Sequence, residues 1–337
     1  MQGNTDLQQL EPRSAPFRAR RLGHVNLWVS DYERAYDYYR NVLGFEHAYT
    51  QPNIKGAFVT NNNTYHDFAL SDVTSHLAPA GQKTGLGHFA FELRNEVDLA
   101  DGYRKAKESG AEFAWLSNFE VARSAFRADP DGNFAEVYAD VVPDWRAVRS
   151  GVVHKKTHTD KQRVQAGAKY IPGETFEPVS EEFYPTKPEI LIVKEALFHP
   201  KRTAHVSLIT KDHEAMYDFY TGYLGLVPFF GDRSSDFVIL GGTHSDGDDV
   251  VLHRPLDGVE PGLHHIGIEV IDVDKLDSAK AELAKRDIKI DSETRHPARE
   301  ALTIIAMDGI RMQFFGNRDW RPELLQGLGR QEALALL

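Results

Sequence analysis

Apolar and polar residues along this chain follow first the period of a strand and then the period of a helix. Residues 24–29, with the sequence HVNLWV, alternate between two faces, as a half-buried strand does. The next apolar positions form one helical stripe that ends at a glycine: Tyr32, Ala35, Tyr36, Tyr39, Val42, Leu43 and Gly44. Two short apolar runs follow at residues 57–62 and 65–70. This order predicts a β-α-β-β-β module whose last strand includes residues 65–70.

The same order of elements occurs again after His88, and then twice more in the second half of the chain. After His88 come a strand with the sequence FAFEL, a helix at residues 98–110, and further short strands. Residues 21–45 resemble residues 202–226, and their histidines, His24 and His205, lie 181 positions apart. The phrases GLGHFAFEL and GLHHIGIEV lie 177 positions apart, as do DGNFAEVYAD and DGIRMQFFGN. A nearly constant offset over three separate segments indicates a duplicated domain.

The repeats predict an α+β protein of four β-α-β-β-β modules, paired into two homologous domains that each curl a mixed sheet around a central cavity. The expected boundaries are a polar lead, a first domain, a proline-containing linker, a second domain and a C-terminal helix, at residues 1–19, 20–147, 148–200, 201–320 and 321–337. We expect the active metal site in the first domain.

Composition limits which residues can bind a metal and which partners the protein can have. The chain of 337 residues has no cysteine and 15 histidines, so a metal would be held by His, Asp, Glu or Gln. Its net charge of −11 argues against nucleic acid as a partner. No run of about 18 apolar residues predicts a membrane span, and the first residues lack an apolar signal core. We therefore expect a cytoplasmic protein, with no membrane partner.

Strand alternation places three metal-ligand types on equivalent faces. On the three strands that contain them, His24, His88 and Glu136 point away from the apolar residues that would pack against the helices. If the sheet is curved, these side chains can converge. Two neutral imidazoles and one carboxylate form the facial triad typical of non-haem Fe(II), which leaves coordination positions open for substrate and O₂. A single histidine on a strand is more often a structural residue. Three ligand-type residues in register, with the histidines repeated in the second copy, favour a site.

The phrases HVNLWV, HFAFEL and DPDGNFAEVY resemble those of the vicinal oxygen chelate superfamily, which contains glyoxalases, bleomycin resistance proteins and dioxygenases. The four modules are similar to type I extradiol ring-cleaving dioxygenases over residues 20–145 and 200–320. The resemblance implies that His24, His88 and Glu136 bind Fe(II), with Mn(II) as the alternative ion. It also implies that His66 is a catalytic acid or base. Asn26 would either contact oxygen or substrate or support the metal ligands as a scaffold group.

Two departures from that family stand out. Its metal usually lies in the C-terminal domain, whereas here the second copy has His205 and His265 but Gln313 in place of the carboxylate. We read this second site as degenerate, although glyoxalase-type members use Gln as a ligand. In addition, the family usually has a tyrosine behind the metal ligands and another histidine before the last strand. The corresponding positions here are near Phe126 and Ser117, and neither residue supplies the same hydrogen bond.

The sequence thus favours an Fe(II)-dependent extradiol dioxygenase that opens a catechol-like ring with O₂ in aromatic-compound catabolism. The aromatic side chains expected to line its ring pocket are Trp28, Phe68, Phe126 and Tyr138. One alternative is a glyoxalase-like, metal-dependent isomerase or lyase. Another is a resistance-type protein that binds a small molecule. The expected partners are a small aromatic diol, O₂ and further copies of the chain in a homo-oligomer.

Overall fold

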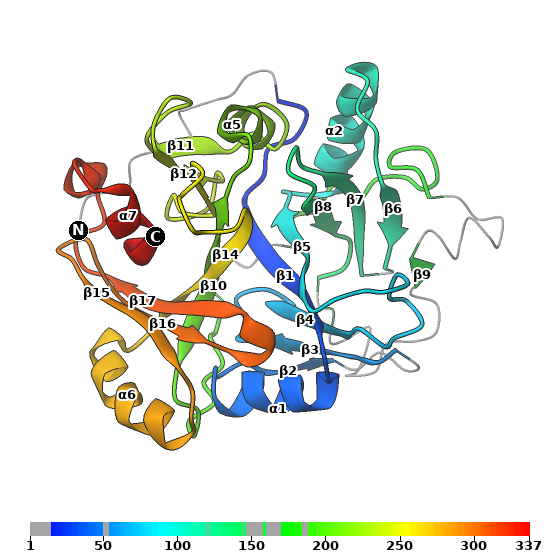
Figure 1. Ribbon diagram of the computed structural model, residues 1–337. Helices are drawn as coiled ribbons and strands as arrows, with labels where there is room; N and C mark the ends of the chain where they lie inside the picture. The colour runs from blue at the N-terminus through cyan, green and yellow to red at the C-terminus, as the bar shows by residue number, and fades with distance from the viewer. Residues whose placement is uncertain are drawn as a thin grey trace.

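The computed structural model describes residues 15–49, 54–119, 121–143, 145, 158–159, 170–183 and 188–337. Two curled sheets form its centre, and the longer helices lie at the periphery (Figure 1). Both sheets are mixed: β1 (Arg21–Val29) pairs with β4 (Phe68–Asp72) in parallel and with β5 (Gly85–Glu92) antiparallel. The predicted α+β fold with two repeated domains is confirmed.

The first sheet has the strand order β2-β3-β4-β1-β5-β8-β7-β6-β9. Its remaining elements are α1 (Tyr32–Asn41), β2 (Glu46–Tyr49), β3 (Gly56–Thr60), α2 (Glu96–Glu108), β6 (Trp115–Asn118), β7 (Ala122–Ala128), β8 (Phe134–Asp140) and β9 (His158–Thr159).

The second sheet has the order β11-β12-β13-β10-β14-β17-β16-β15, which repeats the first without its ninth strand. Its strands and main helices are β10 (Pro200–Ile209), α5 (His213–Gly222), β11 (Val227–Phe230), β12 (Phe237–Gly241), β13 (Val250–His253), β14 (Gly262–Val270), α6 (Leu276–Lys285), β15 (Ile290–Arg295), β16 (Arg299–Ile305) and β17 (Arg311–Asn317). Short 3₁₀ turns cover Val273–Lys275, Met307–Gly309 and Pro322–Leu325, and α7 covers Arg330–Leu336.

Local sequence explains where α1 begins. Asp31 is its N-cap, and the Asp31 carboxylate accepts hydrogen bonds from the backbone N–H groups of Glu33 and Arg34. These bonds satisfy two of the donors that a helix leaves free at its first turn. On β1 the predicted helix-facing residues Val25 and Leu27 are fully buried. The hydrophobic pattern therefore identified the packed face of this strand correctly.

One strand boundary differs from the expectation. The segment at residues 65–70 was expected to be a strand throughout, but β4 begins at Phe68. His66 and Asp67 lie in the segment before β4. The main chain of Asp67 still bonds to Val25 and Val59 in the neighbouring strands, while its carboxylate accepts from the backbone N–H of Asn61 in the preceding turn.

The expected domain boundaries remain predictions, since most of the lead and much of the linker lie outside the described residues. The described end of the lead packs across the two copies: the backbone N–H groups of Phe17 and Ala19 donate to Tyr223 and Leu224 of the second copy. Within the predicted C-terminal helix region, the structure has a 3₁₀ turn and the short helix α7. Among the described residues, no helix is both long and apolar enough to cross a bilayer.

Candidate metal centre

Three neighbouring strands bring His24, His88 and Glu136 together. In the ladders of β1 with β5 and of β5 with β8, Ala90 pairs with both His24 and Glu136. His24 Nε2 lies 3.1 Å and His88 Nε2 lies 3.2 Å from the same oxygen, Glu136 Oε2. Their ligand atoms all lie within 4.8 Å of one another, and no other group of three His, Asp or Glu donors in the described part of the chain meets that condition.

A bulge in β1 helps to aim the first histidine. The register of β1 on β5 shifts between Leu22 and His24, which leaves Gly23 as the extra residue. Bulges of this kind turn the side chain that follows them. A Cβ atom at Gly23 would lie 2.1 Å from the hydroxyl oxygen of Tyr138, so the glycine also makes room for this ring beside His24. The Tyr138 and His24 rings are 5.3 Å apart at their centroids.

Charge at the cluster is arranged as a metal requires. Burial alone would raise the pKa of Glu136, but hydrogen bonding and charge interaction with His24 and His88 outweigh it and lower that pKa to about 2. Burial lowers the pKa of His24 below its ordinary value. At neutral pH the cluster therefore presents one carboxylate and a neutral His24 ring. Since metals bind the deprotonated forms of these groups, the donor set fits a divalent ion.

His66 lies beside this cluster even though it comes from a turn. Its ring centroid is 4.1 Å from that of His24. Tyr49 Oη lies 3.4 Å from His66 Nδ1, and the Phe58 and Trp145 rings lie 5.5 and 5.4 Å from the His66 ring. Sequence reasoning missed these three aromatic neighbours, because no local signal connects them to His66.

Asn26 also lies on the ligand face of β1, opposite His88 in the ladder. Its amide nitrogen donates to Ser71 Oγ at 3.2 Å. A Cβ atom on Gly87 would come within 2.3 Å of Asn26 Oδ1, so the glycine leaves space for this side chain. The structure thus holds the Asn26 amide next to the cluster through its strand neighbours.

Of the four aromatic residues expected to line the site, three divide into two groups, and the role of Trp28 stays a prediction. Phe126 packs edge-on against the His88 ring at 5.1 Å, and Tyr138 lies beside His24. Phe68 instead packs in the core against Tyr39 and Phe45, so its expected place in the ring pocket is wrong. The reason is strand alternation, because Phe68 faces α1.

The second copy repeats the histidine geometry but not the surroundings. The His205 and His265 rings are 5.7 Å apart and inclined at 76°, compared with 5.6 Å and 77° for His24 and His88. Gly267 stands where the first copy has Ala90 between His24 and Glu136, and the His205 ring lies directly over Gly267: a Cβ atom there would be 2.2 Å from the ring.

Other side chains fill the region around His205. Its Nδ1 lies 3.5 Å from Asp248 Oδ2, and that carboxylate also pairs with the buried Arg299 at 2.6 Å. Gln313 turns its amide nitrogen toward the carbonyl of Ala335 in α7, at 3.1 Å. Our reading of this copy as degenerate stays a prediction, and the buried guanidinium is an argument in its favour.

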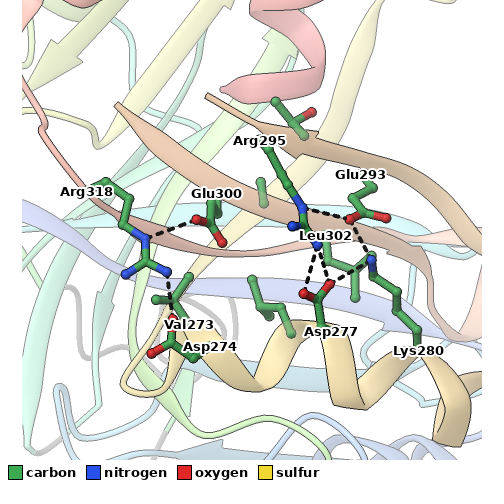
Figure 2. Close-up of a pocket in the computed structure, with 12 residues that line it drawn as sticks. Val273, Asp274, Asp277, Lys280, Glu293, Arg295, Glu300, Leu302 and Arg318 are labelled. Atoms are coloured by element: carbon green, nitrogen blue, oxygen red, sulfur yellow. Dashed lines mark hydrogen bonds and ion pairs between the residues drawn. The ribbon is translucent and has the colours of Figure 1, made fainter. Parts of the chain in front are cut away.

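A separate hollow of about 280 Å³ lies between α6 and strands β15 and β16 of the second copy. Figure 2 shows that its charged side chains face one another: Arg318 pairs with Asp274, and Arg295 with Asp277. These partners satisfy the charges of the hollow, and it contains neither the histidine cluster nor an aromatic ring. We therefore place the candidate site at His24, His88 and Glu136.

Comparisons with known proteins agree with this architecture. Biphenyl-2,3-diol 1,2-dioxygenase 2 from Rhodococcus globerulus is 31% identical over 121 residues, which cover 36% of this chain but only 63% of that relative's length. Catechol-2,3-dioxygenase from Bacillus subtilis (strain 168) is 25% identical over 253 residues, or 74% of each chain.

Two solved structures share the fold. The 2,3-dioxygenase LapB from Pseudomonas sp. KL28 has a TM-score of 0.62 at 17% identity, covering 91% of this chain and 97% of that one. The Mn(II)-bound glyoxalase from Novosphingobium aromaticivorans has a TM-score of 0.61 at 17% identity, covering 90% and 84%. The family model of the Glyoxalase/Bleomycin resistance protein/Dioxygenase superfamily matches residues 21–137 and 202–314, and this chain therefore belongs to that superfamily.

Proposed function

We propose that this protein is an extradiol dioxygenase that uses Fe(II) and O₂ to open the ring of a catechol-like substrate. The observation that carries the proposal is the buried cluster of two histidines and one carboxylate, with a further histidine beside it. The two relatives, which are named dioxygenases of a catechol and of a 2,3-diol, support the same class of substrate.

The donor set explains the choice of metal. His24, His88 and Glu136 would hold the metal, and this donor set is the one that suits Fe(II) in enzymes acting on O₂. When bound, Fe(II) would supply the Lewis acidity that favours the ionised diol and a route for electrons from the diol to O₂. Both oxygen atoms enter the product, so the reaction needs no separate reductant.

His66 is suited to move a proton. It lies against His24, and its Nδ1 faces the hydroxyl of Tyr49. Imidazole exchanges protons near neutral pH, so His66 can take a hydroxyl proton from the diol and return it later. The rings of Phe58 and Trp145 beside it would exclude water and favour a flat aromatic substrate. Asn26 would orient an oxygen atom of the substrate.

The test is anaerobic loading with Fe(II), followed by a panel of catechols with oxygen uptake and the yellow ring-opened product as readouts. Glu136→Ala should abolish metal binding and activity. Loss of a partner outside the coordination sphere already costs about 10- to 100-fold in affinity, and loss of a ligand should cost more. Gln313→Ala, at the equivalent position of the second copy, is the matched control and should keep most of both. Equal loss of iron in the two variants would contradict a site in the first domain.

A second candidate function is a glyoxalase-like isomerase or lyase. The observation that favours it is Phe126, which packs against His88 where the dioxygenases that the sequence resembles offer a hydrogen-bonding group. Such an enzyme would retain nickel, cobalt or zinc and show no oxygen uptake with any diol. Protein purified with no metal, and without gain of activity on loading, would instead favour a binding protein. A cytoplasmic location and a homo-oligomeric state stay predictions.

A further inference from the structure

Two buried aspartates occupy equivalent places in the two domains. Asp67 precedes β4 and Asp249 precedes β13, and both are almost completely inaccessible to solvent. The carbonyl of Asp67 accepts from the N–H of Val25 in β1 at 3.0 Å, and the carbonyl of Asp249 accepts from Val206 in β10 at 3.2 Å. Each aspartate thus joins the first strand of its own domain through its main chain, which leaves its carboxylate for other partners.

Each carboxylate reaches into the other domain. Asp249 Oδ1 accepts a hydrogen bond from the backbone N–H of Leu22 at 2.6 Å, just before the bulge that aims His24. In the reverse direction, Asp67 Oδ1 accepts from the hydroxyl of Thr203 in β10 at 3.3 Å, and the backbone N–H of Thr203 also bonds to this carboxylate. Strands β1 and β10 also contact each other directly. The second domain is therefore bonded to the segments that carry the first domain's site.

Asp67 also organises the turn that contains His66. Its Oδ2 accepts from the Asn61 backbone N–H at 2.9 Å and from the Thr60 hydroxyl at 3.0 Å. The turn is closed further by the Thr64 hydroxyl, which donates to the carbonyl of His66 at 2.8 Å. A chain of hydrogen bonds and peptide units thus runs from Thr203 through Asp67 to His66.

Burial makes this carboxylate sensitive to the loss of a donor. Desolvation raises the pKa of Asp67 to about 6, while its hydrogen bonds act in the opposite direction. A buried carboxylate that loses the Thr203 hydroxyl gains no water in exchange, so it should shift toward the donors that remain, the backbone N–H groups of Thr203 and Asn61 and the Thr60 hydroxyl. The peptide of His66 directly precedes Asp67, so a shift of the carboxylate should move it.

We propose that Thr203, although it lies in the second domain, is a positioning residue for His66 in the first. It acts through the carboxylate of Asp67 and touches no reacting atom. This explains a use for the duplicated domain that does not depend on a second metal. The inference about reaction rate rests on the proposed dioxygenase function, whereas the inference about the position of His66 does not.

The test compares Thr203→Val with Thr203→Ser. Valine keeps the shape but lacks the hydroxyl, whereas serine keeps the hydroxyl. Thr210→Val is the matched control, because Thr210 is also buried in the second domain and its hydroxyl bonds only within that domain, to the carbonyl of His253 and near His213. Thr203→Ala serves as a smaller replacement if the valine variant does not fold.

The first readout uses metal-free protein labelled with ¹⁵N in histidine, at one fixed pH. Thr203→Val should move the ring resonances of His66 more than those of His88, Thr203→Ser should restore them, and Thr210→Val should leave them in place. The second readout is kinetic: with iron content unchanged, Thr203→Val should lower kcat by about three- to tenfold, the value of one hydrogen bond, with less effect on KM.

The outcomes separate the two proposals. If His66 resonances are the same in Thr203→Val and wild type, the positioning role is wrong, whatever the activity. An equal shift in Thr210→Val would also contradict it, because the effect would then be general destabilisation. If the resonances move as expected but wild-type protein oxidises no catechol, the positioning role holds and the proposed function fails.

Discussion

His253 offers a test of how a buried histidine makes the second domain sensitive to acid. This residue ends β13, is 2% exposed, and has Nε2 3.1 Å from the hydroxyl oxygen of Ser207. Burial, and after it the charges of His264, His205 and His213, lower its pKa from 6.5 to about 3. The folded protein therefore keeps this ring neutral well below neutral pH.

The sign and size of the stability change follow from the linkage between proton binding and folding. Between pH 6.5 and about 3, the unfolded chain binds a proton at His253 that the folded protein does not bind. The stability contributed by the neutral ring is thus fully present above pH 6.5 and is lost as the pH falls. One pH unit corresponds to about 1.4 kcal/mol, so at pH 5 the loss should be about 2 kcal/mol.

The assay is urea unfolding of wild type and His253→Gln at pH 7.5 and pH 5.0, monitored by circular dichroism. Glutamine changes packing equally at both pH values, so only the difference between them reports the proton. Between pH 7.5 and 5.0 the wild type should lose about 2 kcal/mol more than the variant. The same substitution at the exposed His76 is the control and should leave the wild-type pH dependence in place. Equal losses in wild type and His253→Gln would refute the reasoning.

Two further predictions concern space and charge. Gly87→Ala places a methyl group 2.3 Å from Asn26 Oδ1, so it should displace that amide and reduce turnover while iron binding is retained. Gly222→Ala meets no atom within 4 Å and should leave turnover unchanged; equal loss in both variants would contradict a role for Asn26. Asp248→Asn leaves the fully buried Arg299 without its ionic partner and should cost about 3–5 kcal/mol of unfolding free energy, measured in urea at pH 7.5. A cost below about 1 kcal/mol would show that the guanidinium finds other compensation.

The repeat of four modules and the ligand face were readable from the sequence because both depend on local periodicity. Side chains alternate along a strand with a period of two, so His24 and Glu136 had to point away from their apolar neighbours. The start of α1 at Asp31 was readable for a similar reason, since capping uses residues only two or three positions away.

Tertiary structure alone decided which side chains meet. The approach of His66 to His24 and its enclosure by Tyr49 and Trp145 depend on how a turn and distant segments pack over the sheet. The contact of Asp67 with Thr203 joins residues 136 positions apart. Strand period fixes a direction but not a partner, because register and domain packing are set by the burial of the whole core. For that reason the sequence identified the three residues of the candidate site, while only the fold could show that the second domain is bonded to the turn that holds its neighbouring histidine.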